Sequence, residues 1–354
     1  MTFQTPSSQF RTPILFLIFN RPALTKSVFE AIREARPGKL YIAADGPRYA
    51  IKGELEKCLQ AREITKQVDW DCEVKTLFRE ENLGCGKGVS TAITWFFSQE
   101  QEGIILEDDC LPSSDFFRFC SELLNYYRHD TRIMGIGGTN LVPENLRANE
   151  CSYSFSNHNS IWGWGTWKRA WDLYDYEMTQ YRKVLKHGYL KSQFSSQYEV
   201  DYFEWVFERT FHFPSITWDY QWEFIRRINS GLTILPQKNL VRNIGFGEDA
   251  THTTKEGVAS SKLKLEELNF PLIHPKYVMV DVEADRIAFI KHYTTSMSRL
   301  KSAIKTLFPV SIRRLIFKSS MKRFIKLNQH QHSDKRHLAS HQTQLEDLPT
   351  PNFR

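Results

Sequence analysis

The sequence lacks several features that would place it in a specialised class of protein. Its 354 residues contain no run of about 18 apolar residues, so we expect no transmembrane helix. The six cysteines form no CxxC pair and have no regular spacing, which argues against a zinc site and a disulfide framework. The early apolar run 14–19 leads into Asn-Arg-Pro and not into a small-residue cleavage site. We therefore expect a cytoplasmic protein.

Acidic residues are missing from one part of the chain. Residues 286–333 contain 11 Lys and Arg and no Asp or Glu, whereas residues 1–285 contain 33 basic and 38 acidic residues. The formal net charge of +6 therefore comes from this one segment. Nucleic-acid-binding proteins spread basic residues over a folded face with aromatic side chains, so we expect no nucleic-acid partner.

Short apolar runs alternate with segments of helical periodicity in the first 130 residues. This alternation predicts an α/β fold with a mostly parallel, Rossmann-like central sheet. Helices are expected between the first two strands and near 51–66, 88–98 and 113 onward. The predicted strands are 13–19, 39–44, 71–78, 103–106, 132–137, 231–235 and 240–246. No internal repeat is present.

Polar residues follow four of these predicted strands directly. They are Asn20-Arg21, Asp45-Gly46, residues 79–84 and residues 107–109. Open α/β sheets bind ligands beyond the carboxyl ends of their strands. We therefore expect these four segments to converge on one crevice.

Glu107, Asp108 and Asp109 are three consecutive acids after a buried strand. Burial and mutual repulsion would make such carboxylates costly without a compensating cation. Mg²⁺ and Mn²⁺ take carboxylate oxygens and share them with substrate phosphates. Alternatively, these acids could stabilise the start of the helix expected near residue 113 by interacting with its dipole. Three acids, however, exceed what one helix start needs.

The run ILEDDCLPSSDFFRF resembles the acidic motif of GT-A glycosyltransferases, most closely that of the N-acetylglucosaminyltransferase I type and its bacterial relatives. The matches cover roughly residues 12–255 and none of residues 286–354. Further motifs in the order of that family are Asn20-Arg21, Asp45-Gly46, the Gly-Trp segment 162–167, Trp218-Asp219 and the segment 242–247.

This resemblance implies a GT-A fold and an inverting transfer from a nucleotide-diphosphate sugar. A UDP-linked donor is favoured over a guanosine-type one. Asp109 would bind Mn²⁺ or Mg²⁺ together with the diphosphate, and Glu107 and Asp108 would contact ribose and donor-sugar hydroxyls. Arg21 and Asp45 would lie in the nucleotide pocket. The acceptor would be a glycan or a lipid-linked saccharide.

The resemblance also implies a catalytic base and a covering loop. Asp219 would take the proton of the acceptor hydroxyl, which must be lost as that hydroxyl attacks. Its aromatic surroundings would raise the pKa of this carboxyl toward that of a working base. An alternative for Asp219 is an ion pair near a helix start, and Glu223 is the second candidate for the base. Arg242 would lie near the diphosphate on a loop formed by residues 242–256.

Other residues allow both a functional and a structural interpretation. Trp162 and Trp164 could stack on a sugar, although large aromatic residues more often belong to the core. His252 could add a metal ligand or lie at the surface. The glycine-rich segment 82–88 does not fit a P-loop, because Gly88 follows the lysine where Ser or Thr is required. It could open a helix near the nucleotide or form an ordinary turn.

We expect three regions along the chain. Residues 1–285 would form the GT-A domain, with a nucleotide-sugar-binding half at 12–130 and an acceptor half at 131–285. Residues 286–333 would form basic amphipathic helices that contact an anionic membrane surface, or that pack on the catalytic domain. Residues 334–354 would be a disordered tail.

Two other functions remain open from the sequence. A sugar nucleotidyltransferase also combines a Rossmann-like sheet with acids and Mg²⁺, but it requires a glycine-rich loop where this chain has Asn20-Arg21-Pro22. A membrane-binding or membrane-damaging protein without enzymatic activity would act through residues 286–333.

Overall fold

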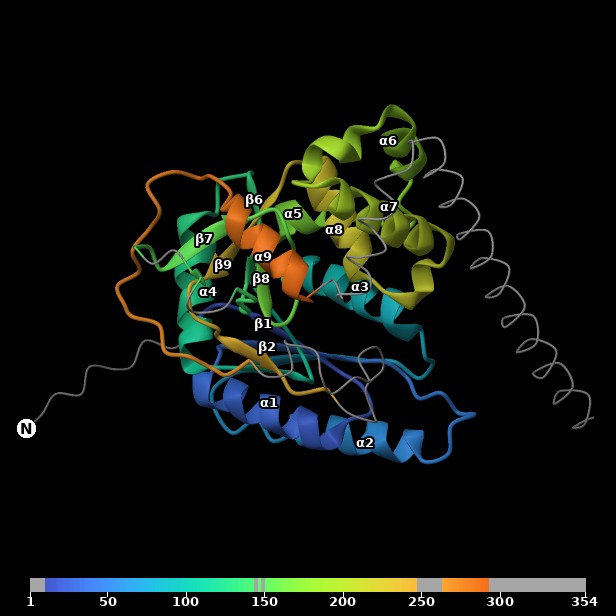
Figure 1. Ribbon diagram of the computed structural model, residues 1–354. Helices are drawn as coiled ribbons and strands as arrows, with labels where there is room; N and C mark the ends of the chain where they lie inside the picture. The colour runs from blue at the N-terminus through green and yellow to red at the C-terminus, as the bar shows by residue number, and fades with distance from the viewer. Residues whose placement is uncertain (1–9, 143–145, 148–149, 247–262, 293–354) are drawn as a thin grey trace, which may run out of the picture.

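A computed structural model describes residues 10–142, 146–147, 150–246 and 263–292. Its centre is an eight-stranded sheet with the order β3-β2-β1-β4-β8-β6-β9-β7 (Figure 1). The strands are β1 (Ile14–Ile18), β2 (Lys39–Ala44), β3 (Glu73–Phe78), β4 (Glu102–Glu107), β6 (Ile133–Gly137), β7 (Tyr153–Ser156), β8 (Trp164–Trp167) and β9 (Leu232–Pro236). A second sheet pairs β5 (Cys110–Pro112) with β10 (Val241–Asn243).

The first four strands of the sheet are parallel to one another. β1 pairs with β2 and with β4, and β2 pairs with β3. β8 lies between β4 and β6 and is antiparallel to both, whereas β6 and β9 are parallel. β7 closes the far side as an antiparallel partner of β9. The predicted α/β class with a mostly parallel, Rossmann-like sheet is confirmed.

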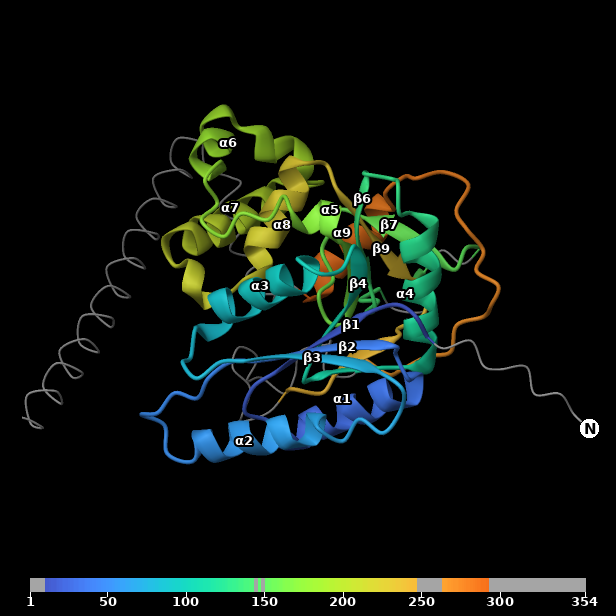
Figure 2. The same ribbon diagram turned by 180° about the vertical axis from the view of Figure 1, so that it is seen from behind.

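Helices cover both faces of this sheet (Figures 1 and 2). The strands present apolar side chains on both faces, and both faces must be covered. In β1, Ile14 and Phe16 belong to one core cluster, and Leu15 and Leu17 belong to the other. The first face is packed by α1 and α4, and the second by α3, α7 and α8. The helices are α1 (Pro22–Ala35), α2 (Glu54–Thr65), α3 (Gly84–Phe97), α4 (Ser114–Tyr126), α5 (Lys168–Trp171), α6 (Tyr181–His187), α7 (Gln197–His212), α8 (Asp219–Ile228) and α9 (Val282–His292).

α9 crosses the expected boundary between residues 285 and 286. Phe289 in this helix is 1% exposed and lies against Tyr198, Phe203 and His158. The first residues of the segment expected to be a basic extension therefore pack on the sheet-bearing body. The rest of that segment and residues 334–354 lie outside the described residues. Among the described residues, no helix is both long and apolar enough to span a bilayer.

Candidate active site

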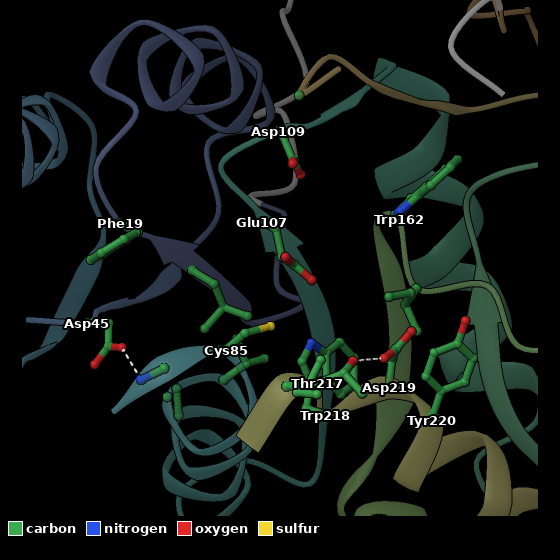
Figure 3. A pocket seen from close by; sticks show the side chains of 18 of the residues that line it. Phe19, Asp45, Cys85, Glu107, Asp109, Trp162, Thr217, Trp218, Asp219 and Tyr220 are labelled. Atoms are coloured by element: carbon green, nitrogen blue, oxygen red, sulfur yellow. Dashed lines mark hydrogen bonds between the residues drawn. The ribbon is translucent and has the colours of Figure 1, made fainter. Parts of the chain in front are cut away.

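A pocket of about 620 Å³ opens at the carboxyl ends of β1, β2 and β4. The four segments expected to converge there all contribute to its lining. Residues of α3, α7, α8 and the segment 159–162 also line it. Figure 3 shows Glu107 and Asp109 at the centre of this pocket, with Asp45 and Asp219 projecting into it from different elements.

The acidic cluster, which we define as Glu107, Asp108 and Asp109, shares a single arginine. Arg21 follows β1 and forms ion pairs with Asp108 and, at 3.0 Å, with Asp109. Asp108 also accepts a hydrogen bond of 3.3 Å from the backbone N–H of Phe19. Arg21 is itself largely buried, and although burial opposes its charge, the two aspartates raise its pKa above the usual value. Among the described residues, one cation thus pairs with this cluster of three carboxylates.

The pKa values in the acidic cluster reflect this imbalance. Burial raises the pKa of Glu107 to about 8, with further contributions from the charges of Asp109 and Asp108. Burial also raises the pKa of Asp108 to about 6, although Arg21 opposes this shift. The negative charge of Asp219 adds to the shift of Glu107, which places this fourth acid within electrostatic reach. Perturbed carboxyl groups in a cleft are typical of functional sites.

Asp45 is positioned by the start of α3. Its carboxylate accepts hydrogen bonds from the backbone N–H groups of Leu83 and Gly84, at 3.0 to 3.1 Å. Burial raises the pKa of Asp45, and these hydrogen bonds oppose that shift. A Cβ at Gly88 would lie 3.0 Å from the Asp45 carboxylate, so the helix packs closely on it. The glycine-rich segment 82–88 therefore opens a helix at the pocket.

Asp219 is the first residue of α8 and lines the opposite part of the pocket. The Thr217 hydroxyl donates a hydrogen bond to its carboxylate. The preceding Trp218 is 2% exposed and stacks on Trp164 with ring centroids 5.6 Å apart. Tyr174 anchors the same turn by donating from its hydroxyl to the Trp218 carbonyl at 3.0 Å. The carboxylate is thus held at the pocket by a rigid aromatic support.

Several residues proposed from the sequence lie away from this pocket. Glu223 is 4% exposed and is paired with Arg226 and Arg227, so no open face remains for it to act as a base. Trp164 is 1% exposed in β8, where it packs in the core and cannot stack on a bound sugar. Arg242 has an exposed side chain on β10 and is not part of the pocket lining. His252 lies outside the described residues.

The pocket fits a divalent cation only if a ligand completes its coordination. In the described part of the chain, no group of three or more His, Cys, Asp or Glu side chains forms a metal site. The cluster nevertheless offers Glu107 and Asp109 in a region of excess negative charge. Mg²⁺ is commonly held by one or two carboxylates together with substrate phosphates. The donor set is therefore compatible with a cation that arrives with a phosphorylated substrate.

Five pocket residues on or directly after α7 were not expected from the sequence. They are Tyr202, Val206, Arg209 and Thr210, on α7, and Phe213, the residue after its end. Cys85 and Thr217 also line the pocket without having been proposed. The dense aromatic composition of residues 198–222 was the only sequence feature that marked this wall.

Comparisons with known proteins give only weak likenesses. No protein-family model and no curated protein matches the chain. HddC from Yersinia pseudotuberculosis is similar at 12% identity and a TM-score of 0.27, over 45% of this chain and 77% of that one. UDP-glucose pyrophosphorylase, solved with UDP-glucose, is similar at 12% identity and a TM-score of 0.25, over 41% and 62% of the two chains.

A third solved structure is similar to the same extent. It is 4-diphosphocytidyl-2C-methyl-D-erythritol synthase from Anaerococcus prevotii, at 10% identity and a TM-score of 0.27, over 52% of this chain and 80% of that one. TM-scores this low are too weak to identify a fold or an activity. The fold assignment therefore rests on the sheet order of the chain itself.

Proposed function

We propose that the protein is a metal-dependent glycosyltransferase that moves a sugar, with inversion, from a nucleotide-diphosphate donor to an acceptor hydroxyl. The observation that carries this proposal is the arrangement of acids around one pocket. The acidic cluster comes from the end of β4, and Asp219 comes from the start of α8 on a different wall. Transfer from a diphosphate requires charge stabilisation at the leaving group and a base near the acceptor.

The donor would lie along the ends of β1, β2 and β4. Its nucleotide would occupy the part of the pocket lined by Phe19 and Asp45, and a UDP-linked sugar is the donor we favour. This choice is supported by the resemblance of residues 105–119 to the acidic motif of the N-acetylglucosaminyltransferase I type. The same resemblance favours a glycan or a lipid-linked saccharide as the acceptor.

Each residue of the pocket has a separate task in this proposal. Asp219 accepts the proton of the acceptor hydroxyl, and Thr217 orients its carboxylate through their hydrogen bond. Arg21 holds Asp108 and Asp109 in place by pairing with both. Asp109 would hold Mn²⁺ or Mg²⁺ together with the donor phosphates, and this cation would offset the negative charge of the departing diphosphate.

Two variants test the proposal. Asp109→Asn should abolish the manganese-dependent part of UDP-sugar binding, measured by calorimetry over a panel of UDP- and GDP-sugars. Asp219→Asn should still bind the donor but should lose about 10²- to 10⁴-fold in kcat for UDP release, the usual contribution of a general base. Asp69→Asn is the matched control, because Asp69 pairs with Arg33 on the surface and does not line the pocket.

The outcomes separate the proposal from its main rival. Unchanged manganese-dependent binding in Asp109→Asn would contradict the role of the acidic cluster. Release of pyrophosphate from UTP and a sugar 1-phosphate would instead indicate a sugar nucleotidyltransferase. That reaction is disfavoured by the junction between β1 and α1, because only Phe19, Asn20 and Arg21 separate Ile18 from Pro22 and none of them is glycine.

The basic segment adds a proposed membrane contact. Because α9 packs on the body through Phe289 and ends at His292, a chain that ends there keeps Phe289 in place and lacks nine of the eleven basic residues of 286–333. This shorter chain should lose co-sedimentation with phosphatidylserine vesicles at low salt, where basic residues contribute about 1 kcal/mol each. Neutral phosphatidylcholine vesicles are the control. Equal sedimentation of both chains would contradict a membrane role for residues 293–354.

A further inference from the structure

The pocket has two ends of different chemistry. In the view of Figure 3, Phe19 and Asp45 lie on one side of Glu107, whereas Trp162, Asp219 and Tyr220 lie on the other. Tyr202 also lines the pocket and hydrogen-bonds with Tyr220, so the second end is rich in aromatic side chains. Trp162 and Tyr220 are both half-buried and line the open space of the pocket.

Trp162 is held in place by a turn that requires glycine. Gly163 has a φ of +64°, and a Cβ at this position would lie 2.8 Å from the side chain of Val241. The Trp162 carbonyl accepts a hydrogen bond of 3.2 Å from the Thr139 hydroxyl. Its ring meets the edge of Phe246 with centroids 5.8 Å apart. The indole is therefore fixed beside the pocket.

Tyr220 is fixed from the other side by the first turn of α8. Trp218 anchors this turn in the core, and the Gln221 amide donates a hydrogen bond of 2.8 Å to the Thr217 carbonyl. Tyr220 also hydrogen-bonds with the side chain of Tyr202, which links α8 to α7. Tyr220, which directly follows Asp219, is thus held in place, and Trp162 lies on the neighbouring wall of the pocket (Figure 3).

We propose that Trp162 and Tyr220 form the acceptor subsite and hold a pyranose ring of a saccharide next to Asp219. This inference rests on the proposed glycosyltransferase function. Aromatic rings pack on the C–H faces of sugars, and the Tyr220 hydroxyl can hydrogen-bond to a ring substituent. If the acceptor were a small polar molecule or a peptide, its hydroxyl would not require two aromatic side chains around Asp219.

The reaction at this subsite balances without a further reactant. The acceptor O–H bond breaks and its proton passes to the Asp219 carboxylate. The acceptor oxygen forms the new bond to the anomeric carbon of the donor sugar. The bond from that carbon to the diphosphate breaks, and the nucleoside diphosphate leaves with the electron pair. Trp162 and Tyr220 only have to hold the acceptor ring so that one of its hydroxyls lies at Asp219.

The test uses the full chain with manganese and the UDP-sugar that binds best. Methyl α- and β-pyranosides of glucose, galactose, mannose and N-acetylglucosamine are supplied as acceptor probes, alongside a serine- and threonine-containing peptide. UDP release is measured with and without each probe. Trp162→Ala and Tyr220→Ala should each raise the acceptor KM about tenfold, and more than they raise the donor KM. Tyr220→Phe should recover part of the loss, because it keeps the ring.

Tyr189→Ala is the control variant, because Tyr189 is 61% exposed and does not line the pocket. If the wild type neither binds nor hydrolyses any UDP-sugar, the proposed function fails. If it hydrolyses the donor but only the peptide speeds UDP release, or no pyranoside does, the saccharide subsite is overturned. Equal changes in donor and acceptor KM in both alanine variants would also overturn it.

Discussion

Two clusters of charged residues lie within the same body and have opposite charge balance. In the acidic cluster, three carboxylates share Arg21, and the pKa of Glu107 is raised to about 8. The second cluster, which we call the ion-pair cluster, consists of Glu223, Arg226, Arg227 and His158. There, burial alone would raise the pKa of Glu223, but Arg227 and Arg226 lower it to about 2.

The two clusters also differ in what their surroundings provide. Arg226 donates to the carbonyls of Gly231 and Asn157 at 2.8 Å, and Arg227 donates to the Gln193 carbonyl at 2.6 Å. With the nearby charge of Asp285, the ion-pair cluster is therefore balanced within the fold, although the Arg226 Nε has no hydrogen-bond partner among the described residues. The acidic cluster instead opens on a pocket and has more negative charge than the described residues neutralise. Buried charge that the fold balances is structural, whereas charge that it leaves unbalanced indicates a site for a ligand.

The largest change in stability is expected when the carboxylate of the ion-pair cluster is removed. Glu223→Gln leaves two buried guanidinium groups without the carboxylate with which both form ion pairs, so we expect a loss of about 3–5 kcal/mol in the free energy of unfolding. Denaturant unfolding at pH 7 measures this. Glu122→Gln is the control, since Glu122 forms the same i,i+4 pair at 2.8 Å with Arg118 but on the surface. Similar losses of stability in Glu223→Gln and Glu122→Gln would contradict the distinction between the buried ion-pair cluster and an ordinary surface ion pair.

The sequence identified the acidic cluster better than the ion-pair cluster. Short apolar runs predict β1, β2 and β4, and parallel strands bring their carboxyl ends to one edge, so Arg21, Asp45 and the acids could be placed together. The pairing of Glu223 depends on which face of α8 is buried. That face is decided by the packing of α7, α9 and the segment 157–158, which no local pattern encodes.

The aromatic residues also show that burial cannot always be predicted from the local sequence. Trp164 and Trp162 are two residues apart, yet the first is in the core and the second lines the pocket. The difference arises because Trp164 belongs to β8, a strand of four residues that is inserted between β4 and β6. The sequence WGTW has neither the length nor the alternation that predicts a strand. Its conformation is imposed by pairing with both neighbours.

The next largest effect is a dependence of stability on pH that arises in the ion-pair cluster. Burial lowers the pKa of His158 to about 3, and the charge of Arg227 adds to this shift. Below pH 6.5 the unfolded chain binds a proton that the folded chain does not, so stability falls as the pH falls toward 3. Between pH 6.5 and 5 this amounts to about 2 kcal/mol.

His158→Gln removes this titration and keeps an acceptor for the hydrogen bond of 2.9 Å from Arg227. Its free energy of unfolding should fall less than that of the wild type between pH 7 and pH 5, measured by urea unfolding at fixed ionic strength. Identical pH slopes for the two proteins would show that His158 binds its proton equally well in the folded and the unfolded chain. The ion-pair cluster would then be less balanced than we infer.

The last effect is expected in the acidic cluster, and it has the opposite sign. Because the folded-state pKa of Glu107 is raised, folding binds protons between pH 4.5 and 8, and stability is lost as the pH rises through this range. Glu107→Gln removes the unfavourable charge and should increase the free energy of unfolding at pH 8, measured in EDTA. The same variant should lose donor turnover, since activity requires the charge that destabilises the fold. A loss of stability in Glu107→Gln, comparable with that in Glu223→Gln, would mean that the carboxylate is held by the fold and not reserved for a ligand.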